Sequence, residues 1–197
     1  MKKLESYYRR EGETYLIEIK LKRLDQLFNS LDPSPFLARD LDENARGYIV
    51  DAVSEFSLST PLKLVFYLPD TERSTADSIF PQALHHYFNY CQRGEQRRLR
   101  VILRQGRIAL FVGLLFLFVC LSLSELVVTK LGKDTFAHFV EEGLIIIGWV
   151  ALWQPAEIFL YRWWPVRYRQ RVFEKLSRIP IEIRPFREHP EREAFDF

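Results

Sequence analysis

The chain contains 197 residues, of which 48% are hydrophobic and 27% are charged, and its formal net charge is only +2. A chain so close to neutral gives no support for nucleic-acid binding, which strong or clustered positive charge would indicate. The sequence contains no phosphate-binding loop, dinucleotide fingerprint or nucleophile elbow, and we therefore expect no enzyme activity and no cofactor.

The first predicted elements are a strand, a helix and a second strand. Residues 15–21 alternate apolar and charged side chains, which is typical of a half-buried strand. Apolar residues then recur at helical spacing over 41–56, with Asp42 as a suitable N-cap. The apolar run 62–68, bounded by prolines, predicts the second strand.

A polar stretch, 70–78, follows, and Pro81 suits the first turn of the next helix. No strong helix breaker lies between this helix and Ile108. We therefore expect it to run directly into the next apolar segment.

Two apolar segments, 108–129 and 143–161, are long enough to cross a bilayer core of about 30 Å. A pair of buried helices in a soluble core is the less favoured interpretation. Arginines flank both segments on the same side, whereas the connection over 130–142 is mixed in charge. Because basic flanks stay cytoplasmic, we expect a transmembrane hairpin in the plasma membrane with both termini cytoplasmic. The basic belt expected to face anionic lipid comprises Arg97, Arg98, Arg100, Arg104, Arg107, Arg162, Arg167, Arg169 and Arg171.

After the second span Pro165 is expected to interrupt the helix, and 179–183 alternates again as a third strand. A sheet of two strands is marginal, so this strand is expected to complete the sheet; the alternative is pairing with another subunit. The charged tail that follows is either disordered or a docking segment.

The predicted fold class is α+β: a small cytoplasmic mixed α/β domain interrupted by a transmembrane helical hairpin. Its parts are an N-terminal domain over 1–106, the hairpin over 107–164, and a C-terminal helix, strand and tail over 165–197.

Polar residues inside the predicted spans are the candidate functional positions, since such groups usually face protein or water. Glu125 and Glu157 lie at different depths, which favours a structural role at each membrane interface, by pairing or snorkelling, over transport. In a hairpin, Glu157 is within reach of Arg104 or Arg107. Gly113 and Gly148 permit close helix contacts, so we expect a homo-oligomer. The polar candidates are Ser122, Ser124, Glu125, Gln154 and Glu157.

Two apparent metal motifs are rejected. His85, His86 and Cys91 point in different directions on a helix, which does not suit a metal site. The acidic residues from Asp40 imitate a calcium loop, but the glycine and the final glutamate of that loop are missing. We therefore expect no metal.

Residues 148–167, with the stretches WQPAEI and WWP, and the following RIPIEIRP resemble a signature of uncharacterised bacterial two-span membrane proteins. The resemblance implies a bacterial plasma membrane and no particular activity. Together these features favour a self-associating, non-enzymatic membrane scaffold with a cytoplasmic protein partner. The alternative is a subunit of a small oligomeric channel or transporter, with Glu125 and the nearby serines lining the path.

Overall fold

The computed structural model describes residues 7–131 and 135–185, with only the backbone given for 71–78 and Leu131. It divides into two compact units. The first, here called the α/β unit, comprises Met1–Arg93 and Gln170–Phe197. The second, the helical unit, comprises Gly94–Arg169 and is inserted in the sequence of the first. The predicted C-terminal tail lies outside the described residues.

The α/β unit is built on a four-stranded sheet with the order β1 (Arg10–Glu11), β2 (Thr14–Lys20), β3 (Leu62–Leu68) and β4 (Ile181–Pro185). Strand β1 is antiparallel to β2, whereas β2, β3 and β4 are parallel neighbours. The three predicted strands are confirmed to within two residues. The prediction that the C-terminal strand completes the sheet is also confirmed, because β4 pairs with β3 in this chain.

Strand β1 was not predicted, since two residues carry no alternation. It is joined to β2 through Gly12, whose φ of 62° lies in the left-handed region that favours glycine.

Helix α1 (Glu43–Ser54) connects the parallel strands β2 and β3, which a short turn cannot join. The predicted cap is confirmed, because the Asp42 carboxylate accepts hydrogen bonds from the backbone N–H groups of Asn44 and Ala45. The much longer connection between the parallel strands β3 and β4 contains the whole helical unit.

Helix α2 (Asp70–Leu131) includes the polar stretch 70–78, so it begins before Pro81, where we expected its first turn. Acidic residues favour the N-terminus of a helix through its dipole, so this polar composition is compatible with the earlier start. Pro81 consequently lies inside α2 rather than in its first turn. The predicted continuity of this helix into the apolar segment is confirmed.

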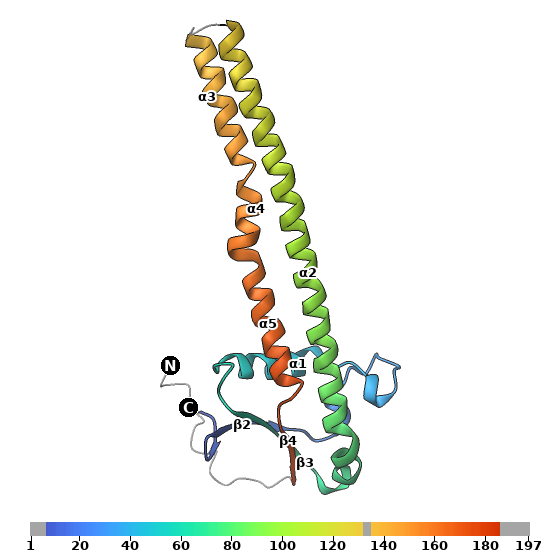
Figure 1. Cartoon of the computed structure of the whole chain (residues 1–197). Helices are drawn as coiled ribbons and strands as arrows, with labels where there is room; N and C mark the ends of the chain where they lie inside the picture. Colours follow the sequence, from blue (N-terminus) through green and yellow to red (C-terminus); the bar gives the residue numbers. More distant parts are fainter. Residues whose placement is uncertain (1–6, 132–134, 186–197) are drawn as a thin grey trace, which may run out of the picture. The chain divides into compact units, whose positions relative to one another are not determined.

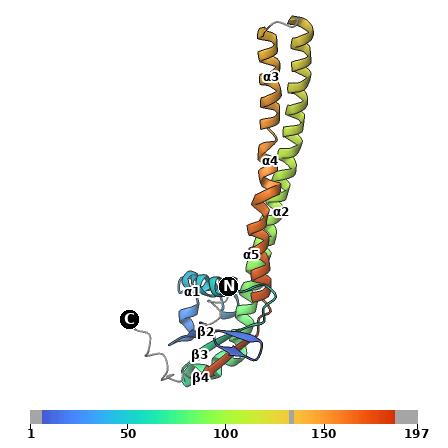
Figure 2. The same cartoon turned by 90° about the vertical axis from the view of Figure 1, so that its left-hand side faces the viewer.

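One face of the sheet forms the core of the α/β unit together with α1, the first part of α2 and the end of α5 (Trp163–Leu176). Phe66 of β3 and Phe80 of α2 meet edge to face, with ring centroids 4.8 Å apart. Leu176 of α5 is fully buried in the same cluster. Figures 1 and 2 show these elements gathered around the sheet.

The other face of the sheet carries a layer of charged groups around the buried side chains of Leu16 and Val65. The Arg184 guanidinium donates to Glu182 at 2.8 Å and to Glu11 at 2.7 Å. Lys63 on the central strand also pairs with Glu182, at 3.0 Å. This network links the two edge strands across the sheet.

In the helical unit, α2 is followed by α3 (Thr135–Val150), α4 (Trp153–Glu157), the π-helical turn η3 (Ile158–Arg162) and α5. Because α3 begins at Thr135, most of the connection predicted over 130–142 is helical. Pro165 does not interrupt the helix, because the chain continues from the π-helical turn η3 directly into α5 through this residue. The helix is instead broken at residues 151–152, one turn before Pro155.

Candidate functional site

The two apolar helices of the helical unit pack against each other through small residues. A Cβ added to Gly106 would lie 2.8 Å from the Ile158 side chain, and one added to Gly148 would lie 2.8 Å from Leu117. A Cβ added to Gly113 would lie 3.0 Å from the carbonyl oxygen of Ala151. Rising residue numbers on α2 thus meet falling numbers on its partner, so the helices run antiparallel (Figures 1 and 2).

The contact face of α2 repeats every seven residues, as in a coiled coil. Its buried positions include Leu99, Gly106, Gly113 and Cys120. The small residues in this repeat explain why the backbones approach so closely.

On the helix that packs against α2, the π-helical turn η3 lengthens the seven-residue spacing of buried positions by one residue. Buried Ile158 and Val166 are eight positions apart instead of seven, while Pro165 is exposed. A π turn adds one residue to the helix, which accounts for the shift. The Trp163 indole N–H donates to the carbonyl oxygen of Phe159 at 2.7 Å, which satisfies one of the carbonyls in this turn.

The break before α4 has a definite cause. Proline has no N–H to donate to the carbonyl four residues earlier, so Pro155 leaves the carbonyl of Ala151 without its helical hydrogen bond. Leu152 bonds to Trp149 in a tighter turn, with an N–H to oxygen distance of 3.0 Å. The carbonyl of Ala151 lies against Gly113, where an added Cβ would come within 3.0 Å of its oxygen.

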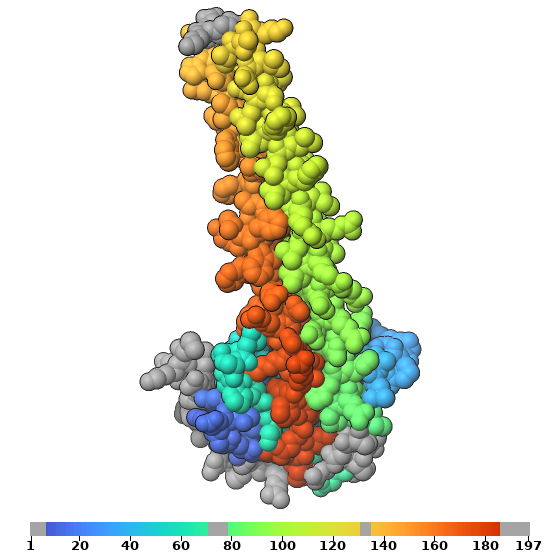
Figure 3. Space-filling model, viewed as in Figure 1, coloured from blue at the N-terminus to red at the C-terminus, as the bar shows by residue number. Residues whose placement is uncertain are grey.

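The apolar side chains of this pair point outward. Two helices, Ile79–Lys130 and Thr135–Leu176, are long and apolar enough to cross a membrane, and only 22% and 17% of their most apolar windows are buried. Phe111, Phe118 and Trp153 are 71%, 68% and 75% exposed. A helix pair in the core of a soluble protein buries most such side chains, so this exposure favours the membrane interpretation of the two helices. Figure 3 shows side chains projecting along both helices.

The predicted polar positions are not gathered into one site. Ser124 is 5% exposed and lies on the contact face, whereas Ser122, Glu125, Gln154 and Glu157 are exposed. Among the described ion pairs, none joins Glu157 to the arginines that we expected to reach it. The glycines that we expected to receive another chain, Gly113 and Gly148, are already covered within the chain.

The residues that meet between the two helices place Glu157 and Glu125 at opposite ends of the outward-facing apolar surface, here called the apolar belt. Glu157 precedes Ile158, which meets Gly106, so it is level with Arg107. Gly148 meets Leu117 and Cys120, so Glu141, two turns earlier, is level with Glu125. The eighteen residues from Arg107 to Glu125 rise about 27 Å in an α-helix. The two polar levels are therefore about one bilayer core apart.

The polar level at Glu125 includes a group that sequence reasoning assigned to a loop. His138 lies 3.3 Å from Glu141 and 3.7 Å from Glu142 on the first turns of α3. Their spacing of three and four residues on a helix was the available signal.

All nine arginines of the predicted basic belt are exposed. Two of them, Arg98 and Arg169, approach Glu95 at 4.0 Å and 3.9 Å. The last one, Arg171, instead lines a groove in the α/β unit.

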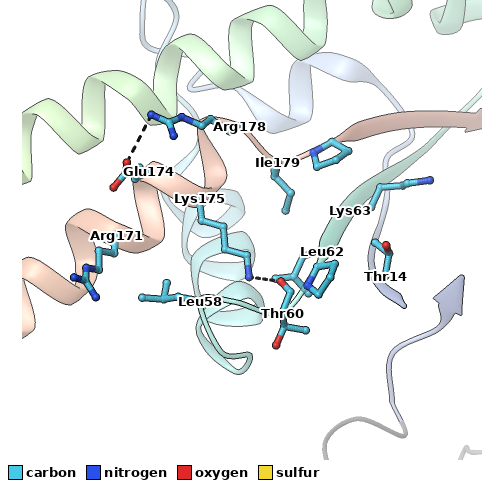
Figure 4. A pocket seen from close by; sticks show the side chains of 12 residues that line it. Thr14, Leu58, Thr60, Leu62, Lys63, Arg171, Glu174, Lys175, Arg178 and Ile179 are labelled. Carbon is cyan, nitrogen blue, oxygen red and sulfur yellow. Dashed lines mark hydrogen bonds and ion pairs between the residues drawn. The ribbon is translucent and has the colours of Figure 1, made fainter. Parts of the chain in front are cut away.

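This basic groove, of about 590 Å³, lies beside the end of α5 and the starts of β3 and β4 (Figure 4). Its charged lining is four cations and one carboxylate: Lys63, Arg171, Lys175, Arg178 and Glu174. Sequence reasoning missed this groove, although three of the cations are spaced at i, i+4 and i+7, which places them on one helical face.

Lys175 fixes one wall of the groove. Its ammonium group donates to the carbonyl oxygens of Ser57 at 3.1 Å and Thr60 at 2.7 Å. Burial lowers the pKa of Lys175, and these carbonyls hold the ammonium in place without neutralising its charge. Arg178, by contrast, pairs with Glu174 at 3.6 Å.

No protein family, curated protein or solved structure was found to match the chain. The resemblance of 148–167 to two-span membrane proteins therefore stays an expectation.

Proposed function

We propose that this protein is a non-enzymatic membrane-anchored docking module. Its helix pair crosses the plasma membrane as a hairpin, and its α/β unit is cytoplasmic and offers a surface to a protein partner. The observation that carries the proposal is the outward-facing apolar belt of the helix pair. This belt is bounded by polar levels at Arg107 and Glu125 that are about 27 Å apart along the helix.

The orientation follows from the arginines. They flank the belt at the level of Arg107 and Arg162, whereas His138 and the neighbouring glutamates mark the other end. Because basic flanks stay cytoplasmic, this asymmetry supports a topology with both chain ends inside the cell.

A channel is the weaker alternative. Ala151 meets Gly113, so Gln154 is level with about Leu110, and Ser122 lies twelve residues beyond that level. These exposed polar positions are thus separated by about 18 Å along the helix. One helix pair offers no continuous polar path over that length, which favours an anchor over a conduit.

Self-association stays a prediction, and the feature that supports it is the edge strand β4 of the sheet. The Leu64 N–H donates to the carbonyl of Pro180, so in the parallel ladder the N–H groups of Ile181 and Ile183 face away from β3. Such an edge can pair with a second copy of this strand. Light scattering of the detergent-solubilised protein, corrected for detergent mass, tests this, and a monomer in both detergent and nanodiscs would refute it.

The decisive experiment on the anchor is cysteine accessibility. In a Cys91→Ala and Cys120→Ala background, one cysteine is introduced at Asp134 and, in a second variant, at Glu188. We expect a membrane-impermeant maleimide to label the first in intact cells and the second only after permeabilisation. Equal labelling or equal protection at the two sites would contradict the hairpin.

A further inference from the structure

We infer that the basic groove binds a phosphate-bearing anion that also has an apolar part. This goes beyond the proposed function, because it concerns only the α/β unit and does not depend on membrane crossing. Arg171, Lys175 and Arg178 line one wall of the groove, and Lys63 comes from β3 on another side, as Figure 4 shows.

The positive charge of this groove is only partly compensated. Arg178 pairs with Glu174 at 3.6 Å, and Lys63 pairs with Glu182 at 3.0 Å. For Arg171, the described residues include no ion-pair partner. The Lys175 ammonium has three N–H donors, of which two are used by backbone carbonyls, so one is left for a ligand.

A phosphate group matches these donors better than a carboxylate does. A planar guanidinium such as that of Arg171 can bind two oxygens of a phosphate at once, and an ammonium such as that of Lys175 adds a point charge. Both hydrogen bonds are charge-assisted and are stronger than those between neutral groups.

The rest of the groove is apolar and indicates that the ligand is not a bare ion. Its non-polar lining consists of Leu58, Pro61, Leu62, Ile179 and Pro180. A volume of about 590 Å³ holds a small organic phosphate. The same chemistry is offered by the headgroup of an anionic phospholipid and by a soluble phosphate ester.

The test uses the full-length protein in phosphatidylcholine nanodiscs at low salt, with phenyl phosphate as the probe and calorimetry as the readout. We expect binding that weakens as salt is raised, and no comparable binding of phenol, which lacks the phosphate. Arg171→Gln should weaken binding by about tenfold, since a hydrogen bond to a charged group is lost. Arg171→Lys should retain part of the affinity that Arg171→Gln loses, because lysine keeps the positive charge but cannot bind two phosphate oxygens at once.

The matched control is Lys22→Gln, which removes one positive charge from an exposed position outside the groove. Arg171 is exposed, so its substitution tests the groove without disturbing the carbonyl contacts of Lys175. The inference is overturned if phenyl phosphate does not bind, if phenol binds equally well, or if Arg171→Gln and Lys22→Gln have the same effect.

The source of the ligand is distinguished by adding phosphatidic acid to the nanodiscs. If a lipid headgroup occupies the groove, the affinity for phenyl phosphate falls in these discs, and Arg171→Gln reduces that fall. If the affinity is unchanged, the groove takes a soluble phosphate ester. Both results support a phosphate site.

Discussion

Gly113 offers the sharpest test of how the helix pair is built. In Gly113→Ala the new methyl group would lie 3.0 Å from the carbonyl oxygen of Ala151 and 3.0 Å from the Leu152 side chain. The side chain can move, but the carbonyl oxygen belongs to the backbone of the other helix. The two helices must therefore separate by a few tenths of an ångström, and overpacking of this kind costs about 1–3 kcal/mol.

The matched control is Gly143→Ala in the same unit, where an added Cβ meets nothing within 4 Å. Alanine favours the helix over glycine by up to about 1 kcal/mol, so this variant should be neutral or slightly more stable. Unfolding of both variants by SDS in mixed micelles, followed through tryptophan fluorescence, measures the difference. Equal free energies of unfolding for Gly113→Ala and Gly143→Ala would refute close packing at this position.

Two further predictions concern the α/β unit. Ile181→Asp, which places a charge at a half-buried position opposite Leu64, should destabilise this unit by about 2–3 kcal/mol, and faster proteolysis of the unit would report it. Hydrogen bonds from Arg184 and Lys63 lower the pKa of Glu182 to about 2 from an ordinary value of 4.5, so its contribution to stability is complete above about pH 5 and is lost as the pH falls toward 2. Because the Glu182 side chain is 39% exposed, solvent screening reduces that contribution to about 1 kcal/mol. Acid titration of unfolding in the wild type and in Glu182→Gln measures it, and the same pH dependence in both proteins would contradict the assignment.

The strands were predictable because their signal is local. Alternation in β2 and the apolar run of β3 follow directly from which face each side chain must bury. Even the return of β4 followed from local pattern and from the weakness of a two-stranded sheet. The same reasoning placed the start of α2 too late, at Pro81 instead of Asp70, because polar residues at 70–78 carry no apolar periodicity.

The helix pair could be located from the sequence but its register could not. Hydropathy identifies long apolar runs, but it does not show which residues of two such runs meet. The extra residue in the turn at Ile158–Arg162 and the carbonyl released by Pro155 depend on contacts with the opposite helix. For this reason we assigned Gly113 to an intermolecular contact that the chain satisfies internally, and Glu141 to a loop instead of α3.

The same pairing of residues between the helices changes the interpretation of the glutamates in the two apolar helices. A carboxylate in the middle of an apolar helix is costly and usually indicates function. Once Glu157 is level with Arg107 and Glu125 is level with Glu141, each carboxylate lies at an end of the apolar belt, where it can remain hydrated. Neither glutamate then requires a second subunit or a transported ion to explain it. Arg171 and Lys175 instead line the basic groove, and this directs the search for function to the α/β unit.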